Sequence, residues 1–260
     1  MPKSRESAYK FTEHPNVANY DWRLAVATTL AEPVLGAAGV LHEAGAPFVA
    51  FCPIKYDSKT SIQFNMPSVC GLLLDYANRL WVECNDAQAL FTESLPNGAF
   101  TVKNDADLMF FLEKRMAIVV FAYTAIEAFT NEIIEEAYTK ASYTYSEPNP
   151  KTGTAYTLEE IERYMDLETK LCGVLPEITK IKNPKGTAVW QTFGQMRKIR
   201  HFIIHPKLAD KIQSSPDAQV LWKMLTDSAF RNFAVGAKDL MMHYAGAGAH
   251  PARWLFKCPF

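Results

Sequence analysis

The sequence predicts an all-α fold, a helical bundle that follows an N-terminal helical extension. Apolar residues recur at helical spacings of three and four along most of the 260 residues. The longest periodic stretch runs from about Asp105 to Tyr138, and its centre is apolar on nearly all sides, as in the buried helix of a bundle. Hydrophobic residues make up 48 % of the chain and charged residues 21 %, which is enough apolar material for a sizeable core.

The first hundred residues are expected to form a helical region of their own. Apolar periodicity predicts a helix from Val17 to about Ala31, which Pro33 ends or kinks, and a second helical piece from Val34 to His42. Glycine and proline then interrupt the pattern, and the stretch from Phe48 to Asn65 favours one short β-hairpin. Helical periodicity returns from Ser68 to about Thr92.

The turn signal Pro96-Asn97-Gly98 divides the chain into an N-terminal region, residues 1–100, and a helical bundle, residues 101–260. Within the bundle, proline, glycine and capping residues mark the ends of the helices that follow the central one. The expected order is a loop from Ala141 to Thr154, a helix opened by the capping box Thr157–Glu160, a lysine-rich connection from Pro176 to Lys185, a helix from Thr187 to His205 that Pro206 ends, and a long final helix from Ser215-Pro216 to Gly246.

Cysteine usage and apolar segments indicate the cellular compartment in which the protein is expected. The five cysteines are odd in number and include no CxxC pair, which argues against a disulfide framework and a thiolate zinc site. The N-terminus has no apolar signal segment, and the uncharged run from Met116 to Ile126 is too short to span a bilayer. We therefore expect a cytoplasmic protein that does not engage a membrane.

The charge of the chain is small overall and unevenly distributed. The formal net charge is -1, so no global positive field predicts a nucleic-acid partner. The segment from Lys180 to Lys211 nevertheless holds eight basic residues and one acidic residue, a local charge of +7 (8 − 1). Such a segment can attract an anion even in a neutral protein, although a solvated face is the more common explanation of a charge cluster.

The segment from Arg197 to Pro206 concentrates the residue types that carry chemistry. On a helical wheel, Arg200 lies about 40° from Met196, at the edge of the apolar stripe. A guanidinium at the edge of a core needs an anionic partner or a cavity. His201 and His205 have the i, i+4 spacing of metal ligands, but no HExxH motif or third ligand accompanies them, so we expect no metal and no other cofactor.

The stretch Arg200-His201-Phe202-Ile203-Ile204-His205 resembles the motif of the HEPN superfamily (higher eukaryotes and prokaryotes nucleotide-binding), in which an arginine and a polar residue precede a histidine. The segment from Ala125 to Ile134, in which a glutamate and an asparagine punctuate an apolar run, resembles the earlier core helix of that family. The resemblance covers about Asn104 to Ala245 and implies a HEPN-like helical bundle. The first hundred residues match no family pattern.

The resemblance implies a metal-independent endoribonuclease that cleaves RNA through attack of the substrate's own 2′-hydroxyl. His205 would then be the principal general acid/base, because the unperturbed pKa of histidine, about 6.5, lies near working pH. Arg200 would hold the phosphate with its forked donors, and His201 would help with RNA positioning or proton transfer. Arg197 and Lys198 would steer the RNA backbone.

Two further residues lie on the helix that resembles the family's earlier core helix. Glu127 and Asn131 are an i, i+4 pair on one face of an otherwise apolar stretch. They either form an internal hydrogen-bonded pair or orient Arg200 or one of the histidines. The two interpretations are equally consistent with the sequence.

The resemblance also implies a homodimer, because one histidine cannot easily serve both ends of an in-line displacement. The first expectation is a ribonuclease, as a toxin or antiviral defence effector with an inhibitory or regulatory protein partner. The second is a non-catalytic HEPN module that binds a nucleotide, RNA or a protein partner, and the third is a plain helical interaction protein. A shared cleft for Arg200 and His205 would favour the enzyme, whereas burial of both in a core would favour the third.

Overall fold

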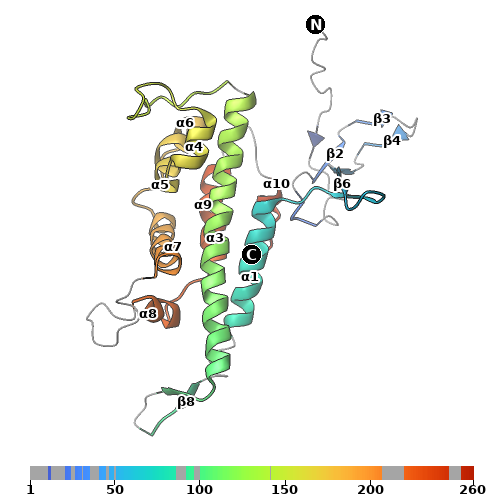
Figure 1. Ribbon diagram of the computed structural model, residues 1–260. Coiled ribbons are helices and arrows are strands. Elements are labelled where there is room, and N and C mark those ends of the chain that lie inside the picture. The colour runs from blue at the N-terminus through green and yellow to red at the C-terminus, as the bar shows by residue number, and fades with distance from the viewer. Residues whose placement is uncertain are drawn as a thin grey trace. The chain divides into compact units, whose positions relative to one another are not determined.

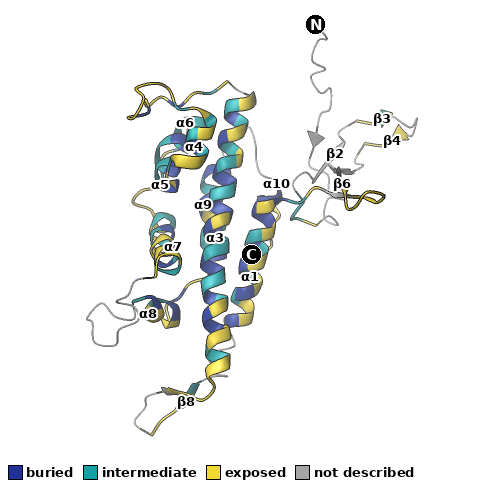
Figure 2. Cartoon of the chain, viewed as in Figure 1, coloured by how far each residue is buried: buried dark blue, intermediate teal, exposed yellow. Residues whose placement is uncertain are grey.

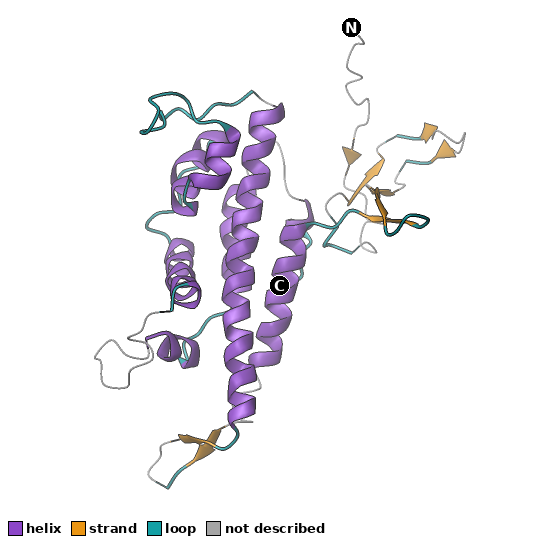
Figure 3. Cartoon of the chain, viewed as in Figure 1, coloured by secondary structure: helices purple, strands orange, loops and turns teal. Residues whose placement is uncertain are grey.

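The computed structural model is mostly helical, as the sequence predicts (Figure 1 and Figure 3). The chain divides into two compact units, residues 1–71 with 252–259, and residues 72–251 with residue 260. The sequence instead placed a boundary at residue 100, whereas the structure puts most of the first helix in the larger, helical unit. The residues that the structure describes are 11–12, 21–24, 27–30, 32–35, 41–44, 47–49, 51–85, 92–96, 100–140, 142–206, 220–245 and 253–260.

The helical unit is built around one long helix, α3, which contacts helices from both earlier and later parts of the chain (Figure 1). Tyr76 of the first helix packs edge-on against Phe121 of α3, with ring centroids 5.0 Å apart. In chain order the helices are α1 (Val69–Asn85), α3 (Asp105–Lys140), α4 (Leu158–Tyr164), α5 (Leu167–Thr169), the π-helical turn η2 (Lys170–Val174), α6 (Leu175–Thr179), α7 (Ala188–Ile204), α8 (Val220–Thr226) and α9 (Phe233–Ala245).

The middle of α3 forms the core of this unit, as its uncharged stretch predicts (Figure 2). Ile118, Ala125 and Ile134 have no exposed surface, and Phe129 is 2 % exposed. By length and composition alone α3 could also cross a membrane, but half of its apolar window is buried against the rest of the protein, as in the core helix of a bundle. This helix therefore provides the rigid element from which nearby polar side chains are positioned.

Local capping signals identify several helix ends correctly. The predicted capping box is present at α4, where the Thr157 hydroxyl accepts the N–H of Glu160 at 3.2 Å and the Glu160 carboxylate accepts the N–H of Thr157 at 2.8 Å. Thr187 caps α7 in the same way, accepting the N–H of Trp190 at 3.2 Å. Each such cap contributes about 1 kcal/mol.

The predicted N-terminal helical extension is wrong for the described residues before Phe51, whereas the helix predicted from Ser68 is confirmed as α1. Residues Ala27–Leu30, expected in a helix, form strand β2, which pairs with β5 (Pro47–Val49) and β1 (Phe11–Thr12) in an antiparallel sheet. The expected second piece contains β3 (Val34–Leu35) and β4 (Leu41–His42), which pair with each other. The periodicity of short apolar runs between glycines and prolines does not distinguish a helix from a strand. Here, pairing with a neighbouring strand determines that these runs are strands.

The predicted hairpin is confirmed over most of its length. Strands β6 (Phe51–Lys55) and β7 (Ser61–Asn65) pair antiparallel from Phe51 opposite Asn65 to Lys55 opposite Ser61. A further hairpin, β8 (Thr92–Ser94) with β9 (Phe100–Val102), flanks the predicted turn at Pro96. The helix predicted to reach Thr92 therefore ends earlier, at Asn85.

The long final helix is broken into α8 and α9, which corrects the sequence prediction. Its predicted start at Ser215-Pro216 lies outside the described residues. The break has a local cause, since Asp227 accepts the N–H of Ala229 at 2.8 Å and Asn232 accepts that of Ala234 at 3.0 Å. Such side chains compete with helical hydrogen bonds and favour a new N-cap. The aromatic tail begins as α10 (Arg253–Phe256), with Trp254 buried.

Candidate functional site

The last turn of α7 presents two histidines side by side. His201 and His205 are both exposed, and their ring centroids are 5.2 Å apart. The backbone of His205 leaves the helical region, with φ −124° and ψ 66°, while its N–H still donates to the carbonyl of His201 at 2.9 Å. Because a proline disfavours helical geometry in the residue before it, Pro206 explains the distorted turn that the sequence predicts.

Arg200 lies at the edge of the core, as its wheel position predicts. Its guanidinium carbon lies 4.9 Å from the centre of the Tyr123 ring on α3, a cation–π arrangement. Tyr123 is 8 % exposed and stacks on Phe193 of α7 at a centroid distance of 5.9 Å. Within the part of the chain that the structure describes, no hydrogen-bond acceptor or carboxylate pairs with the N–H groups of Arg200, and a guanidinium carries five such donors.

Several charges surround the Tyr123 ring. Burial raises the pKa of the Tyr123 phenol above its ordinary value of 10.0, the nearby Arg200 opposes this rise, and Glu127 adds to it. Arg197 and Asp166 also lie close enough to act on the same phenol. The structure thus brings two arginines of α7 and two carboxylates, one from α3 and one from the start of α5, near a buried aromatic ring.

Asn131 has a different partner from the one that the sequence suggested. Its side-chain oxygen accepts a hydrogen bond from Lys170 Nζ at 2.9 Å, and the same ammonium donates to the carbonyl of Glu162 at 2.9 Å. Lys170 is 1 % exposed, and burial lowers the pKa of its ammonium below 10.5, although nearby Glu127 opposes that effect. For Asn131 these contacts favour an internal hydrogen-bonded role over the orientation of Arg200 or a histidine.

Lys170 is the residue that our sequence analysis missed, although a signal for it exists. Leu167, Leu171 and Val174 form an apolar stripe, and Lys170 falls beside that stripe on a helical wheel. A lysine on an apolar face is rarely fully buried unless its charge is paired or hydrogen-bonded. It also begins the π-helical turn η2, a geometry that is uncommon and often occurs at functional sites.

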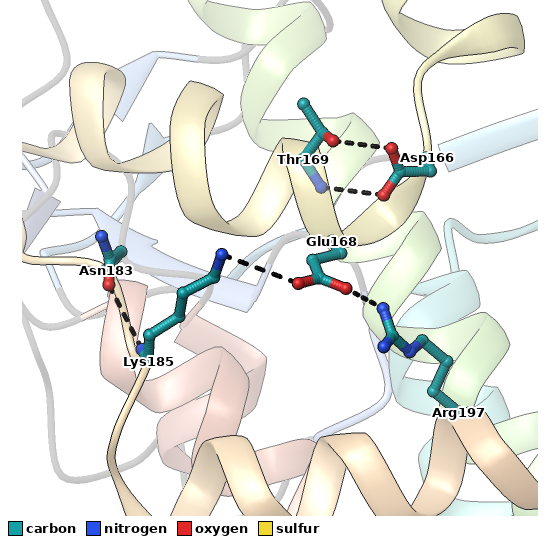
Figure 4. Close-up of polar contacts among 6 residues, drawn as sticks. All are labelled: Asp166, Glu168, Thr169, Asn183, Lys185 and Arg197. Atoms are coloured by element: carbon teal, nitrogen blue, oxygen red, sulfur yellow. Dashed lines mark hydrogen bonds and ion pairs between the residues drawn. The ribbon is translucent and has the colours of Figure 1, made fainter.

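Arg197, predicted to steer RNA, is already paired. Its guanidinium contacts the carboxylate of Glu168 on α5, and Lys185 Nζ lies 3.7 Å from the other oxygen of that carboxylate (Figure 4). The first turn of α5 is fixed by Asp166, which accepts the N–H of Thr169 at 3.0 Å and its hydroxyl at 2.6 Å. Any phosphate that binds Arg197 must therefore compete with a carboxylate of the protein itself.

Lys198 is the predicted site residue that lines a cavity. It is exposed and lines a cavity of about 260 Å³ together with Ile199, Met224 and Phe230. Arg200 and the two histidines do not line this cavity. On α7, Arg197 lies four residues and Lys198 three residues before His201, so both lie on the side of the helix that carries the histidine pair.

The chemistry available at this site is proton transfer and anion binding. Two exposed imidazoles can donate and accept protons, and the Arg200 guanidinium, which has no hydrogen-bond partner among the described residues, can bind a phosphate. Among the described residues no group of three or more histidine, cysteine, aspartate or glutamate side chains is arranged to hold a metal ion. Comparison of the chain with protein-family models, with curated proteins and with solved structures finds no match.

Proposed function

We propose that the protein is a HEPN-type endoribonuclease that cleaves RNA through the substrate's 2′-hydroxyl, with His205, His201 and Arg200 as its catalytic residues. The observation that carries this proposal is the exposed histidine pair, whose rings are 5.2 Å apart. Arg200, the residue before His201, lies over the Tyr123 ring and has no hydrogen-bond partner among the described residues. The motif that resembles the HEPN family supplies the reaction class. A role as toxin or antiviral effector belongs to the same proposal.

In this reaction one imidazole accepts the proton of the 2′-hydroxyl, and the 2′-oxygen forms a bond to phosphorus. The bond from phosphorus to the 5′-oxygen breaks, and a protonated imidazole gives its proton to that leaving oxygen. Arg200 stabilises the additional negative charge on the crowded phosphate. The products are a 2′,3′-cyclic phosphate and a 5′-hydroxyl.

Two groups can supply the second proton transfer. His201 of the same chain is near enough to His205 to share one phosphate, and a second copy of the chain would bring another His205. We propose the homodimer because an imidazole on each side of the phosphate suits in-line displacement. His201 then positions RNA and shares the proton transfer.

A non-catalytic module that binds nucleotide, RNA or a protein partner is the second candidate. It is favoured by the pairing of Arg197 with Glu168, which reduces the positive charge available to a long RNA. The net charge of −1 also argues against binding of a long RNA. The two candidates share the Arg200 site and differ in whether the histidines transfer protons.

The test is RNA cleavage by purified protein in EDTA, compared among single variants. His205→Ala should lose about 10²–10⁴-fold in rate, because it removes a proton-transfer group. Arg200→Ala should lose about 10²–10³-fold, because it removes charge at the transition state. His243→Ala on α9 and Arg163→Ala on α4 remove the same residue types elsewhere and should retain activity. Binding without cleavage would favour the non-catalytic module.

A further inference from the structure

Two cations from different segments converge on one carboxylate beside the proposed site (Figure 4). Arg197 comes from α7 and Lys185 from the turn that precedes it, and each approaches a different oxygen of Glu168. The side chains remain accessible, with relative exposures of 49 % for Arg197, 55 % for Lys185 and 31 % for Glu168. A phosphate could therefore reach both cations from solvent.

The turn that carries Lys185 is held by its own hydrogen bonds. The Asn183 side-chain oxygen accepts the N–H of Lys185 at 3.3 Å, and the Thr187 hydroxyl donates to the carbonyl of Pro184 at 2.7 Å. Gly186 has a φ of 86°, which a residue with a side chain adopts only with strain. The backbone below Lys185 is thus fixed relative to the start of α7.

Arg197 also shares one row of α7 with the proposed catalytic histidine pair. Arg197 and His201 are four residues apart, so they lie on one face with a rise of about 6 Å between them. Successive phosphates of an extended RNA strand have a comparable spacing. A strand whose scissile phosphate lies at the histidines would therefore place a neighbouring phosphate near Arg197.

We infer that Arg197 and Lys185 form a binding site for the RNA backbone phosphate next to the scissile one, and that Glu168 occupies this site as an internal competitor. Arginine binds phosphate through two parallel N–H donors and lysine through a point charge, which is the combination present here. When RNA is absent, the Glu168 carboxylate forms ion pairs with the same two cations. The inference rests on the proposed function, because that function places the scissile phosphate at the histidines and so sets the course of the RNA strand along α7.

The experiment measures binding of a fully 2′-O-methylated RNA oligonucleotide in EDTA by fluorescence anisotropy. This probe has the phosphates of RNA but no hydroxyl for cleavage, so binding is separated from catalysis. Glu168→Gln should tighten binding about three- to tenfold, since it releases two cations from exposed ion pairs. It should also steepen the dependence of log K on log salt by about 0.7 for each phosphate gained.

Glu159→Gln is the matched control. It removes the same charge and breaks an exposed ion pair with Arg163 at 3.0 Å on α4, outside the proposed phosphate site. A gain in Glu168→Gln that is no larger than in Glu159→Gln overturns the inference. Thermal unfolding checks that both variants fold, and Glu168→Asp, with a shorter carboxylate, should give a smaller gain in the same direction.

A double-mutant cycle assigns the gain to Arg197. Arg197→Gln should change affinity by less than about twofold in the wild-type background, where Glu168 neutralises it, and should remove most of the gain in the Glu168→Gln background. Equal effects of Arg197→Gln in both backgrounds contradict internal competition. If Glu168→Gln tightens binding but the protein cuts no RNA, the phosphate site is supported and the proposed nuclease function fails. If the protein cuts RNA but Glu168→Gln does not tighten binding, only the phosphate site fails.

Discussion

At the scale of single residues, the buried Lys170 links the π-helical turn to α3. Its ammonium is held by the Asn131 side chain and the Glu162 carbonyl, each at 2.9 Å. Asn131→Ala should lower the free energy of unfolding by about 1–3 kcal/mol, because it leaves a buried charged group with one partner fewer. Denaturant titration measures this loss.

The control for that prediction is Thr124→Ala, an exposed position on the same helix whose hydroxyl donates only to the Val120 carbonyl. Lys170→Met removes the buried charge together with its hydrogen bonds, and such replacements are often neutral or stabilising. In the Lys170→Met background, Asn131→Ala should cost much less. An equal cost in both backgrounds would show that Asn131 stabilises the fold by some other contact.

Lys170 also predicts a dependence of stability on alkaline pH. Burial lowers its folded-state pKa below the ordinary 10.5, so between the two values the unfolded chain binds more protons than the folded chain. The free energy of unfolding of the wild type should therefore rise relative to Lys170→Met as pH increases through that window. Urea titrations of both proteins at several alkaline pH values test this, and parallel curves would refute it.

The sequence predicted some residues of the candidate site and missed others for a physical reason. Arg200 was placed at the edge of the core because its position on a helical wheel depends only on α7. The pairing of Glu168 with Arg197 joins residues 29 positions apart on different helices, so no local pattern contains it. The same holds for Lys170 and Asn131, which are 39 positions apart.

At the scale of elements, the end of α7 determines where the His205 imidazole points. Pro206→Ala removes the restriction on His205 and should allow helical geometry there, which moves the imidazole away from its present place beside His201. The rate of RNA cleavage should fall by about tenfold or more, since proton transfer depends on position. The unfolding free energy should change little.

Steady-state cleavage rates and urea titration of Pro206→Ala measure the two effects separately. Pro150→Ala, in the loop before α4, is a comparable replacement of an exposed proline that leaves the end of α7 and the turn before it untouched. Unchanged cleavage in Pro206→Ala would show that the distorted turn is incidental. Loss of activity with a matching loss of stability would indicate unfolding rather than misplacement.

The helices were predicted where local signals suffice. The capping box at Thr157 and the proline after His205 act within one turn, so the sequence alone locates them. The strands near the N-terminus depend on partners up to 22 residues away, as between Ala27 and Val49, and local periodicity does not indicate such pairing. The apolar pattern continues across the break between α8 and α9, so periodicity does not indicate it, whereas the hydrogen bonds of Asp227 and Asn232 produce it.

At the scale of the whole molecule, the proposed reaction predicts a two-fold homodimer. Sedimentation at micromolar concentration should give twice the mass of the 29.2 kDa chain. Mixing His205→Ala with Arg200→Ala should then restore part of the activity if each copy contributes different groups to a shared site. A strict monomer that still cleaves RNA would remove the shared site and assign the second proton transfer to His201.

In the proposed reaction, the histidine pair cleaves RNA by activating the substrate's own 2′-hydroxyl. The most direct measurement uses a 2′-O-methylated RNA strand with one unmodified ribonucleotide, incubated with the protein in EDTA and analysed by mass spectrometry. Attack by the 2′-hydroxyl predicts a single cut after that ribonucleotide, a 2′,3′-cyclic phosphate on one product and a 5′-hydroxyl on the other, and no such product with His205→Ala. Cuts at methylated positions, a strict need for added metal, or full activity of His205→Ala would contradict it.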